Sequence, residues 1–238
     1  MRAMVFAAGL GTRLRPITNE IPKALVDVGG VTMLEAVLRR LAAAGVTEAV
    51  VNTHHFHGKI EDHLREKKNF GLKISLSREE EFPLETGGGL KKAAAFFGGG
   101  EPFFAYNADV WCEMDLKALY AAHRASGALA TLAVRDRQTA RALLFDGELN
   151  LKGRAGDGAP LPAGLRALAF SGIQVLSPAI FGKLTETGVF SITASYLRLA
   201  AAGEKVRGFE DRSQFWCDIG NLERLEAVRR RYERAGLI

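Results

Sequence analysis

Ala7-Ala8-Gly9-Leu10-Gly11-Thr12-Arg13-Leu14-Arg15-Pro16 is the stretch of sequence that decides the fold. A short apolar run at 3–7 leads into it, which predicts a buried parallel strand followed directly by a glycine-containing loop. Gly9 and Gly11 would allow positive φ angles and a close approach of the backbone to an anion. Successive N–H groups in such a turn form a concave anion site, and Arg13 adds a permanent cation. The loop therefore predicts a phosphate site.

Two better-known phosphate loops do not fit this stretch. A dinucleotide-binding fingerprint would need a third glycine where Leu14 stands, and an acid near position 30, whereas Asp27 falls too early and Glu35 lies on a predicted helix. A P-loop would need Gly-Lys-Ser/Thr, which the stretch lacks. An arginine within the loop suits a polyphosphate that gains charge in a transition state. Taken alone, the loop could also be a plain strand-to-helix turn.

Strands and helices alternate along the first half of the chain, which predicts an α/β fold with a Rossmann-like, three-layer mixed sheet, mainly parallel, and helices on both faces. Thr32 with Glu35 predicts a capping box, and Asp115 predicts a second helix N-cap. We expect strands at 3–7, 49–51, 72–76, 103–106 and 128–134, and helices at 32–44, 60–67, 89–97 and 116–125.

The pattern changes after residue 135. Segment 143–149 predicts a hairpin with an Asp-Gly turn, and the Gly- and Pro-rich segment 152–164 predicts a mobile loop that could close over substrate. Further strands are expected at 169–176 and 215–217, and helices at 194–202 and 221–235. We therefore predict a single domain over 1–238, with a core over about 1–135 that carries the predicted phosphate site, and a second part with a closing helix over about 136–238.

The composition is that of an ordinary globular protein, with 238 residues, 47% hydrophobic and 25% charged. Two cysteines do not make a disulfide framework, and the sequence contains no apolar run of membrane-spanning length. We expect a cytoplasmic protein with no membrane partner. The net charge of +5 favours phosphate-bearing partners. Nucleic acid is disfavoured because the basic residues are scattered, and the run 229–231 is typical of a solvated helix face.

Five segments resemble, in order, the signature of the sugar nucleotidylyltransferases. The first is Gly-x-Gly-Thr-Arg-Leu-x-Pro-x-Thr at 9–18, followed by Pro22-Lys23. The later ones are Leu84-Glu85-Thr86-Gly87-Gly88-Gly89, Asn107-Ala108-Asp109, Phe170-Ser171-Gly172-Ile173 and Trp216-Cys217-Asp218-Ile219-Gly220. The resemblance covers nearly the whole chain. Its pattern is most similar to the N-acetylmuramate-1-phosphate uridylyltransferase branch, with short mannose-1-phosphate guanylyltransferases next.

Asp109 and Asp218 each follow a predicted strand, and ligands of parallel sheets bind beyond the carboxyl ends of strands. One or two carboxylates plus phosphate oxygens are what Mg2+ needs, although each aspartate alone could simply cap a turn. The resemblance assigns both to magnesium. It departs from the family at Ala108, where glycine is usual, and an alanine at positive φ would be strained by about 1 kcal/mol.

The resemblance also implies that about 1–135 is a nucleotide-binding core and that about 136–238 is a sugar-binding part with a closing helix. Arg13, Lys23 and Asp109 would be catalytic. Asn107 and Gly172 would approach the sugar, and Arg135 and Arg207 would hold its phosphate or a lactyl carboxylate, although each arginine could equally be structural. The nucleotide-binding residues would be Ala7, Ala8, Gly9, Gly11, Thr12 and Arg13 for the phosphates, and Leu84, Glu85 and Gly88, at the start of a helix, for the base.

His54, His55 and His57 lack the acidic or cysteine partners of a zinc site and are expected to form a polar cap near the nucleotide. Cys112 and Cys217 flank the two aspartates, but the implied reaction needs no thiol nucleophile.

The implied reaction joins an NTP and a sugar 1-phosphate, with Mg2+, to give an NDP-sugar and pyrophosphate. UTP and N-acetylmuramate 1-phosphate are favoured, in a monomer or homodimer. The alternatives are a mannose-1-phosphate guanylyltransferase, a cytidylyltransferase acting on phosphocholine, and a non-catalytic module that binds nucleotide sugars.

Overall fold

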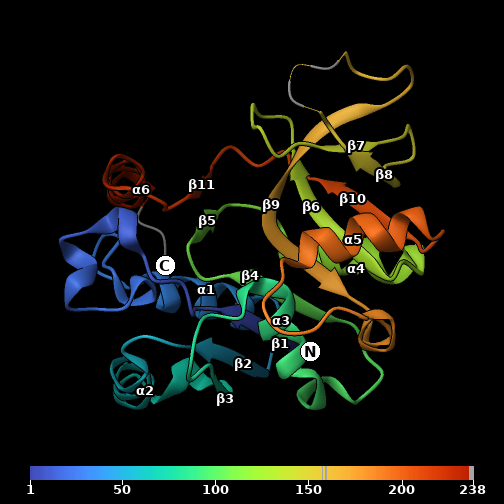
Figure 1. Cartoon of the computed structure of the whole chain (residues 1–238). Helices are drawn as coiled ribbons and strands as arrows, with labels where there is room; N and C mark the ends of the chain where they lie inside the picture. Colours follow the sequence, from blue (N-terminus) through green and yellow to red (C-terminus); the bar gives the residue numbers. More distant parts are fainter. Residues whose placement is uncertain (157, 159, 236–238) are drawn as a thin grey trace.

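The computed structural model of the chain describes residues 1–156, 158 and 160–235. In these residues a mixed sheet has the strand order β10-β6-β9-β4-β1-β2-β3 (Figure 1). Its parallel pairs join β1 to β2 and β4, β2 to β3, and β6 to β10, whereas β9 runs antiparallel between β4 and β6. The strands of this path are β1 (Arg2–Phe6), β2 (Glu48–Thr53), β3 (Lys73–Arg78), β4 (Phe103–Asn107), β6 (Ala130–Arg135), β9 (Arg166–Leu176) and β10 (Val206–Glu210).

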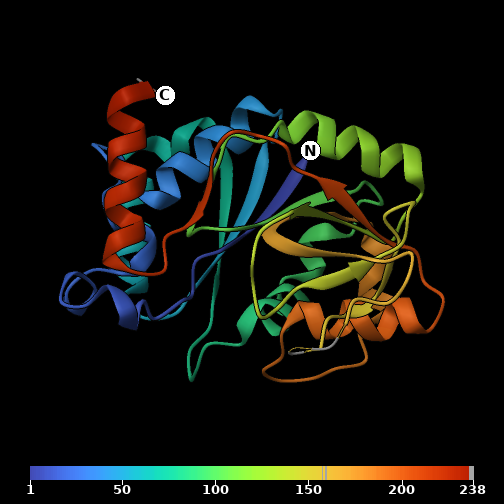
Figure 2. The ribbon, with the colours of Figure 1, turned by 90° about the horizontal axis from the view of Figure 1, so that it is seen from above.

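Helices cover both faces of this sheet, as predicted, because its strands are apolar on both sides. Ala3 and Val5 of β1 belong to one core cluster and Met4 to another, which follows from the alternation of side chains along a strand. The first cluster includes residues of α1, α2 and α4, and the second includes residues of α3 and α5, on the opposite side (Figure 2). These helices are α1 (Met33–Ala43), α2 (His57–Glu66), α3 (Glu85–Lys92), α4 (Leu116–Ser126) and α5 (Ile192–Ala201).

The predicted helix caps are present. Thr32 Oγ1 accepts a hydrogen bond from the Glu35 amide at 3.1 Å, and Asp115 Oδ1 accepts from the amides of Lys117 and Ala118 at 2.9 and 3.1 Å. The reciprocal bond of a capping box, from the Thr32 amide to the Glu35 carboxylate, is replaced by an ion pair of Glu35 with Arg39 at 2.8 Å. Local capping signals therefore placed the starts of α1 and α4 to within one residue.

Three local expectations are corrected. The helix expected at 89–97 begins at Glu85 and ends at Lys92, and a separate 3-10 helix follows at Ala94–Phe97. The hairpin of β7 (Leu143–Phe145) and β8 (Leu151–Arg154) has a longer turn than two residues, because Asp146 Oδ1 accepts from the amides of Glu148 and Asn150. The expected loop 152–164 starts inside β8, and its residues 157 and 159 lie outside the described residues.

The C-terminal helix α6 (Leu222–Ala235) lies beside the N-terminal segment that follows β1 (Figure 1). Tyr232 packs under Gly29, whose φ is 118°, so closely that a Cβ there would lie 2.6 Å from the tyrosine ring. The arginine run 229–231, expected to be solvated, is partly engaged. Arg229 donates to the Asp27 carbonyl oxygen, and Arg231 binds the Glu113 carboxylate at 2.7 Å. The helix α6 is thus bonded both to the segment around Asp27 and to Glu113, which follows β5.

A small antiparallel ladder of β5 (Val110–Cys112) and β11 (Trp216–Asp218) stands apart from the main sheet. A third core cluster underlies it, with Trp111, Ile219 and Leu225 among its buried members. None of the helices within the described residues has both the length and the apolar composition needed to cross a bilayer.

Gly88 tests how tightly α3 is packed. A Cβ at Gly88 would lie 2.3 Å from the carbonyl oxygen of Gly188, which is backbone and cannot rotate away. We expect Gly88→Ala to lower the free energy of unfolding by about 1–3 kcal/mol, as overpacked cores do. The control is Gly98→Ala, where the nearest atom would lie at 3.8 Å. Urea unfolding of both variants checks this, and equal midpoints would contradict the packing described here.

Candidate active site

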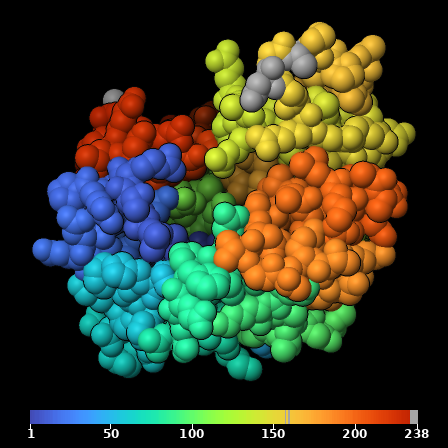
Figure 3. All heavy atoms as spheres, in the orientation of Figure 1, coloured from blue at the N-terminus to red at the C-terminus, as the bar shows by residue number. Residues whose placement is uncertain are grey.

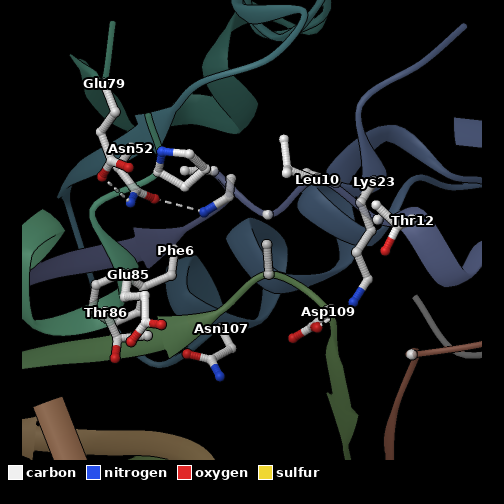
Figure 4. Close-up of a pocket in the computed structure, with 18 of the residues that line it drawn as sticks. Phe6, Leu10, Thr12, Lys23, Asn52, Glu79, Glu85, Thr86, Asn107 and Asp109 are labelled. Carbon is white, nitrogen blue, oxygen red and sulfur yellow. Dashed lines mark hydrogen bonds and ion pairs between the residues drawn. The ribbon is translucent and has the colours of Figure 1, made fainter. Parts of the chain in front are cut away.

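A cleft of about 420 Å³ opens where β1, β2 and β4 reach their carboxyl ends. In the space-filling view the molecule is hollowed at its centre, between the blue N-terminal segment, the red C-terminal segment and the orange half (Figure 3). The lining combines small and apolar residues with positively and negatively charged side chains (Figure 4). It consists of Phe6, Ala7, Ala8, Gly9, Leu10, Gly11, Thr12, Arg13, Lys23, Ala24, Asn52, Glu79, Pro83, Glu85, Thr86, Asn107, Ala108, Asp109 and Gly220.

The loop after β1 forms one wall of the cleft. Gly11 has φ 65° and begins the 3-10 helix Thr12–Leu14. A Cβ at Gly11 would also lie 2.9 Å from Cβ of Lys23 and Cγ2 of Thr18, so both backbone angle and space require glycine. Gly9 differs from the prediction, because its φ is not positive and nothing lies within 4 Å of a Cβ there. The open space beside Gly9 leaves its backbone accessible from the cleft.

The amides of this loop divide into used and available donors. The Ala7 amide donates to Asn52 Oδ1 at 2.7 Å, which removes it from the expected set of phosphate donors. Among the described residues, the amides of Gly9, Leu10 and Gly11 find no acceptor. Unpaired amides at a sharp turn are the usual components of an anion site. The loop therefore supports phosphate binding through residues 9–11 rather than through residue 7.

Lys23 and Asp109 form an ion pair inside the cleft (Figure 4). Lys23 begins the 3-10 helix Lys23–Leu25 after Pro22, and its side chain is only 13% exposed. Asp109 lies two residues after the end of β4, and the amide of the intervening Ala108 donates to the Phe6 carbonyl oxygen at 3.0 Å. Ala108 does not have a positive φ, so alanine is accommodated there without the strain that the sequence left open.

Asp218 is brought to Asp109 by the β5–β11 ladder. Asp218 pairs with Val110, and the Ile219 amide donates to the carbonyl oxygen of Asp109 at 2.7 Å. Arg13 approaches the same strand end, since a Cβ at Gly220 would lie 3.1 Å from its guanidinium. Asp218 itself is not among the lining residues, and its carboxylate is paired with Arg224. Arg13, Lys23 and Asp109 thus line one cleft, and the strand of Asp218 lies beside the segment of Asp109.

The carboxylates suit a divalent metal ion. Asp109 and Asp218 would contribute carboxylate oxygens, which a hard cation such as Mg2+ takes in ones or twos before phosphate oxygens complete the shell. Their side chains are 32% and 37% exposed, which leaves both accessible to an ion from solvent. Each carboxylate is paired with a cation in the structure, which indicates a local demand for positive charge. No third acidic, histidine or cysteine ligand joins them among the described residues.

Two buried residues that the sequence analysis missed support the loop. Asn52, the fifth residue of β2, donates from Nδ2 to Glu79 Oε1 at 2.7 Å, and Glu79 Oε2 accepts from the Leu84 amide at 2.8 Å. With the bond from Ala7 to Asn52, this network links the phosphate loop to the entry of α3. A polar residue at the end of an apolar strand was the available signal for Asn52, whereas nothing in the sequence singled out Glu79.

The segment expected to receive the base is organised differently from the prediction. The amides of Gly87 and Gly88 both donate to the Phe190 carbonyl oxygen, at 2.9 and 3.3 Å, so these helix-start donors are not directed at a ligand. Gly88 is buried against Gly188, and Leu84 does not line the cleft. Glu85 does line it, with φ 57°, next to Thr86. The glycines permit close packing of α3, and the flanking residues face the cleft.

On the opposite side, Asn107 ends β4 and points into the cleft (Figure 4). Gly172 lies within β9 at φ 77°, and a Cβ there would come 2.9 Å from Asn107 Nδ2. The Asn107 side chain therefore fills the space above Gly172. The expectation from the sequence, that a sugar approaches at Gly172, is not met. Gly172 positions Asn107 instead.

The structure does not bring Arg135 and Arg207 to the cleft. Arg135 binds Asp211 at 2.6 Å and the hydroxyl and carbonyl oxygens of Ser213 at 3.0 and 2.9 Å, so its donors hold that segment to β6. Arg207 donates to the Glu148 carbonyl oxygen at 2.5 Å, at the hairpin turn. Both predicted sugar-phosphate ligands are thus corrected to structural contacts, because nearer acceptors take their guanidinium groups.

The histidines and cysteines have structural contacts. His54 Nδ1 lies 2.7 Å from the Glu79 carbonyl oxygen, and the His55 ring lies 3.8 Å from that of Phe56. Neither these two nor His57 lines the cleft. Burial raises the pKa of the Cys112 and Cys217 thiols, which disfavours a thiolate at neutral pH.

Glu79→Gln tests the supporting network. Glutamine has the same shape, but its NH2 group would replace one of the two oxygens that accept from Asn52 Nδ2 and from the Leu84 amide. One of these two donors would then face another donor. We expect the free energy of unfolding to fall by about 1–3 kcal/mol, the cost of an unsatisfied buried group, and the KM for the nucleotide to rise. Urea unfolding and steady-state kinetics check this against Glu81→Gln, a change at an exposed position. Identical behaviour of the two variants would refute the supporting role.

Comparison with known proteins identifies the family. A family described as nucleotidyl transferase matches residues 2–143. The chain is 38% identical to N-acetylmuramate alpha-1-phosphate uridylyltransferase of Caulobacter vibrioides, over 92% of this chain and 91% of that protein. It is 32% identical to the enzyme of the same description from Neisseria meningitidis serogroup B, over 95% and 96%.

A solved structure of UDP-glucose pyrophosphorylase complexed with UDP-glucose superposes with a TM-score of 0.82 over 98% of both chains, at 20% identity, which shows the shared fold. The family match and these two relatives show that the chain belongs to the nucleotidyl transferase family, among its sugar-1-phosphate nucleotidylyltransferases.

Proposed function

We propose that this enzyme transfers the uridylyl group of UTP to N-acetylmuramate 1-phosphate with the help of Mg2+, giving the UDP-sugar and pyrophosphate. The observation that carries the reaction chemistry is the convergence of Arg13, Lys23 and Asp109 on one cleft, with the strand of Asp218 hydrogen-bonded to Asp109. The choice of base and sugar is supported by the two relatives of that activity, each matched over more than nine-tenths of its length.

The acceptor is already a nucleophile, so the protein's task is positioning and charge stabilisation. A phosphate oxygen of the sugar 1-phosphate attacks the α-phosphorus of UTP, a new P–O bond forms, and the bond from the α-phosphorus to the bridging oxygen breaks. The electron pair leaves with pyrophosphate. This chemistry requires no general base, in agreement with a cleft whose lining contains no histidine.

Each part of the cleft has a role in this proposal. The amides of residues 9–11 and the Arg13 guanidinium bind the β- and γ-phosphates, which are the leaving group. Lys23 neutralises charge on the α-phosphate, and Asn107 orients a hydroxyl of ribose or sugar. Asp109 and Asp218 would hold Mg2+, which when bound supplies charge neutralisation to the phosphate oxygens. Glu85 and Thr86, at the start of α3, are placed to contact the base.

Asp109→Asn tests the metal-binding role. The amide keeps the side-chain shape but loses the negative charge that both Lys23 and a cation require. We expect kcat to fall by at least about 100-fold, as when one preorganised electrostatic group is removed from an active site, with the thermal unfolding midpoint little changed. Asp136→Asn, at an exposed position after β6, is the control and should retain activity. Full magnesium-dependent turnover by Asp109→Asn would show that Asp109 is not a metal ligand.

A screen of pyrophosphate release tests the substrates. Each of the four common NTPs is combined with N-acetylmuramate 1-phosphate, mannose 1-phosphate, N-acetylglucosamine 1-phosphate and phosphocholine. We expect the highest kcat/KM for UTP with N-acetylmuramate 1-phosphate. A preference for GTP with mannose 1-phosphate, or for CTP with phosphocholine, would establish the corresponding alternative. Binding of a nucleotide sugar without pyrophosphate release from any pair would indicate a non-catalytic module.

A further inference from the structure

The two aspartates at the cleft are each paired with a cation, and these pairs are of different kinds. Lys23, on Asp109, has a side chain that is 13% exposed and that packs against Gly11. Arg224, on Asp218, is 46% exposed and projects from the first turn of α6. Lys23 is therefore confined to the cleft, whereas the Arg224 side chain has a direct route into water.

Two features disfavour a cation at the position of Arg224. It lies three residues after Asn221, whose Oδ1 accepts from the Arg224 amide at 2.9 Å, and the start of a helix carries a partial positive charge. Arg137 is the second feature. Its guanidinium lies 4.3 Å from the ring centroid of Trp216, two residues before Asp218 on β11. It donates to the Phe170 carbonyl oxygen, and its Nε has no hydrogen-bond partner among the described residues.

The pKa of Arg137 agrees with a repulsion between the two guanidinium groups. Burial lowers this pKa, and the positive charges of Arg224 and Arg135 lower it further. The carboxylate of Asp218 is thus the principal attraction that holds Arg224 at this place, against the helix start and a neighbouring guanidinium. An ion pair that is opposed by its surroundings and open to solvent is readily broken.

We propose that Arg224 is an exchangeable counter-ion of Asp218: it occupies the carboxylate in the metal-free enzyme and leaves for solvent when a divalent cation binds there. Lys23 stays in the cleft because it is enclosed. This inference rests on the proposed function in one respect, the assignment of a metal to Asp218. Its consequence is that the affinity of the enzyme for metal is set partly by a surface arginine that touches no substrate.

The exchange follows from charge. A divalent ion and a guanidinium on the same carboxylate would repel each other strongly at contact distance. Metal binding must therefore include the free energy of breaking the Asp218–Arg224 pair. Pairs exposed to this extent contribute little, so the expected effect of removing Arg224 is a roughly two- to fivefold tighter binding of metal.

The experiment titrates the full-length protein with Mn2+ alone and measures free Mn2+ by electron paramagnetic resonance. Arg224→Gln should bind Mn2+ about two- to fivefold more tightly than the unmodified protein. The matched control is Arg230→Gln, which removes the same charge from an exposed position on the same helix and should leave the affinity unchanged. In an Asp218→Asn background, the Arg224→Gln change should no longer have an effect. Circular dichroism confirms folding of each variant.

The outcomes separate the two proposals. Weaker Mn2+ binding by Asp218→Asn, together with equal or weaker binding by Arg224→Gln, would overturn the exchange and leave the metal site in place. Mn2+ binding that neither Asp109→Asn nor Asp218→Asn alters would overturn the metal site and the exchange together. A similar tightening in Arg224→Gln and Arg230→Gln would reduce the effect to net charge and so also reject the exchange.

Discussion

The pairing of β5 with β11 is the constraint on which the cleft depends. Three residues on each side form the ladder, and the Ile219 amide extends it by donating to the carbonyl oxygen of Asp109. A two-stranded ladder this short is not stable alone. It is held by the third core cluster, in which Trp111 and Ile219 pack with Leu225 of α6. The C-terminal helix therefore helps to shape the cleft, because its packing keeps the strand of Asp218 beside the segment of Asp109.

A second constraint is the compensation of charge within the cleft. Asp109 and Asp218 are each paired with a cation, Lys23 and Arg224, so neither carboxylate is left uncompensated before substrate arrives. Arg13 adds positive charge at the phosphate loop, where pyrophosphate would form. Since a triphosphate and a sugar phosphate bring several negative charges, this arrangement suits ligands that arrive together with a cation. Because Arg224 is more exposed to solvent than Lys23, Arg224 is the cation that can leave its carboxylate more easily.

The conformation of the loop after β1 depends on buried side chains that contact it as well as on its own glycines. Asn52 and Glu79 are buried, and together they join the Ala7 amide to the Leu84 amide through three hydrogen bonds. This network connects the loop after β1 with the segment that precedes Glu85. Buried polar networks that are fully paired rigidify the elements they connect. Two walls of the cleft are thereby held at a defined separation.

The sequence by itself determined the order of most helices and strands, the helix starts at Thr32 and Asp115, and the residue types at the loop, because each depends on contacts within a few positions. It did not predict β5 or β10, which are defined by the strands they pair with. It also indicated Asp109, since a polar residue after an apolar strand falls at the carboxyl edge of a parallel sheet. Only the tertiary structure decided which donors remain available to a ligand. Arg135 and Arg207 find acceptors in segments distant in sequence, Gly88 packs on a remote carbonyl, and Gly172 makes room for Asn107. These outcomes depend on which groups come within hydrogen-bonding or van der Waals distance after folding, and no local pattern encodes that.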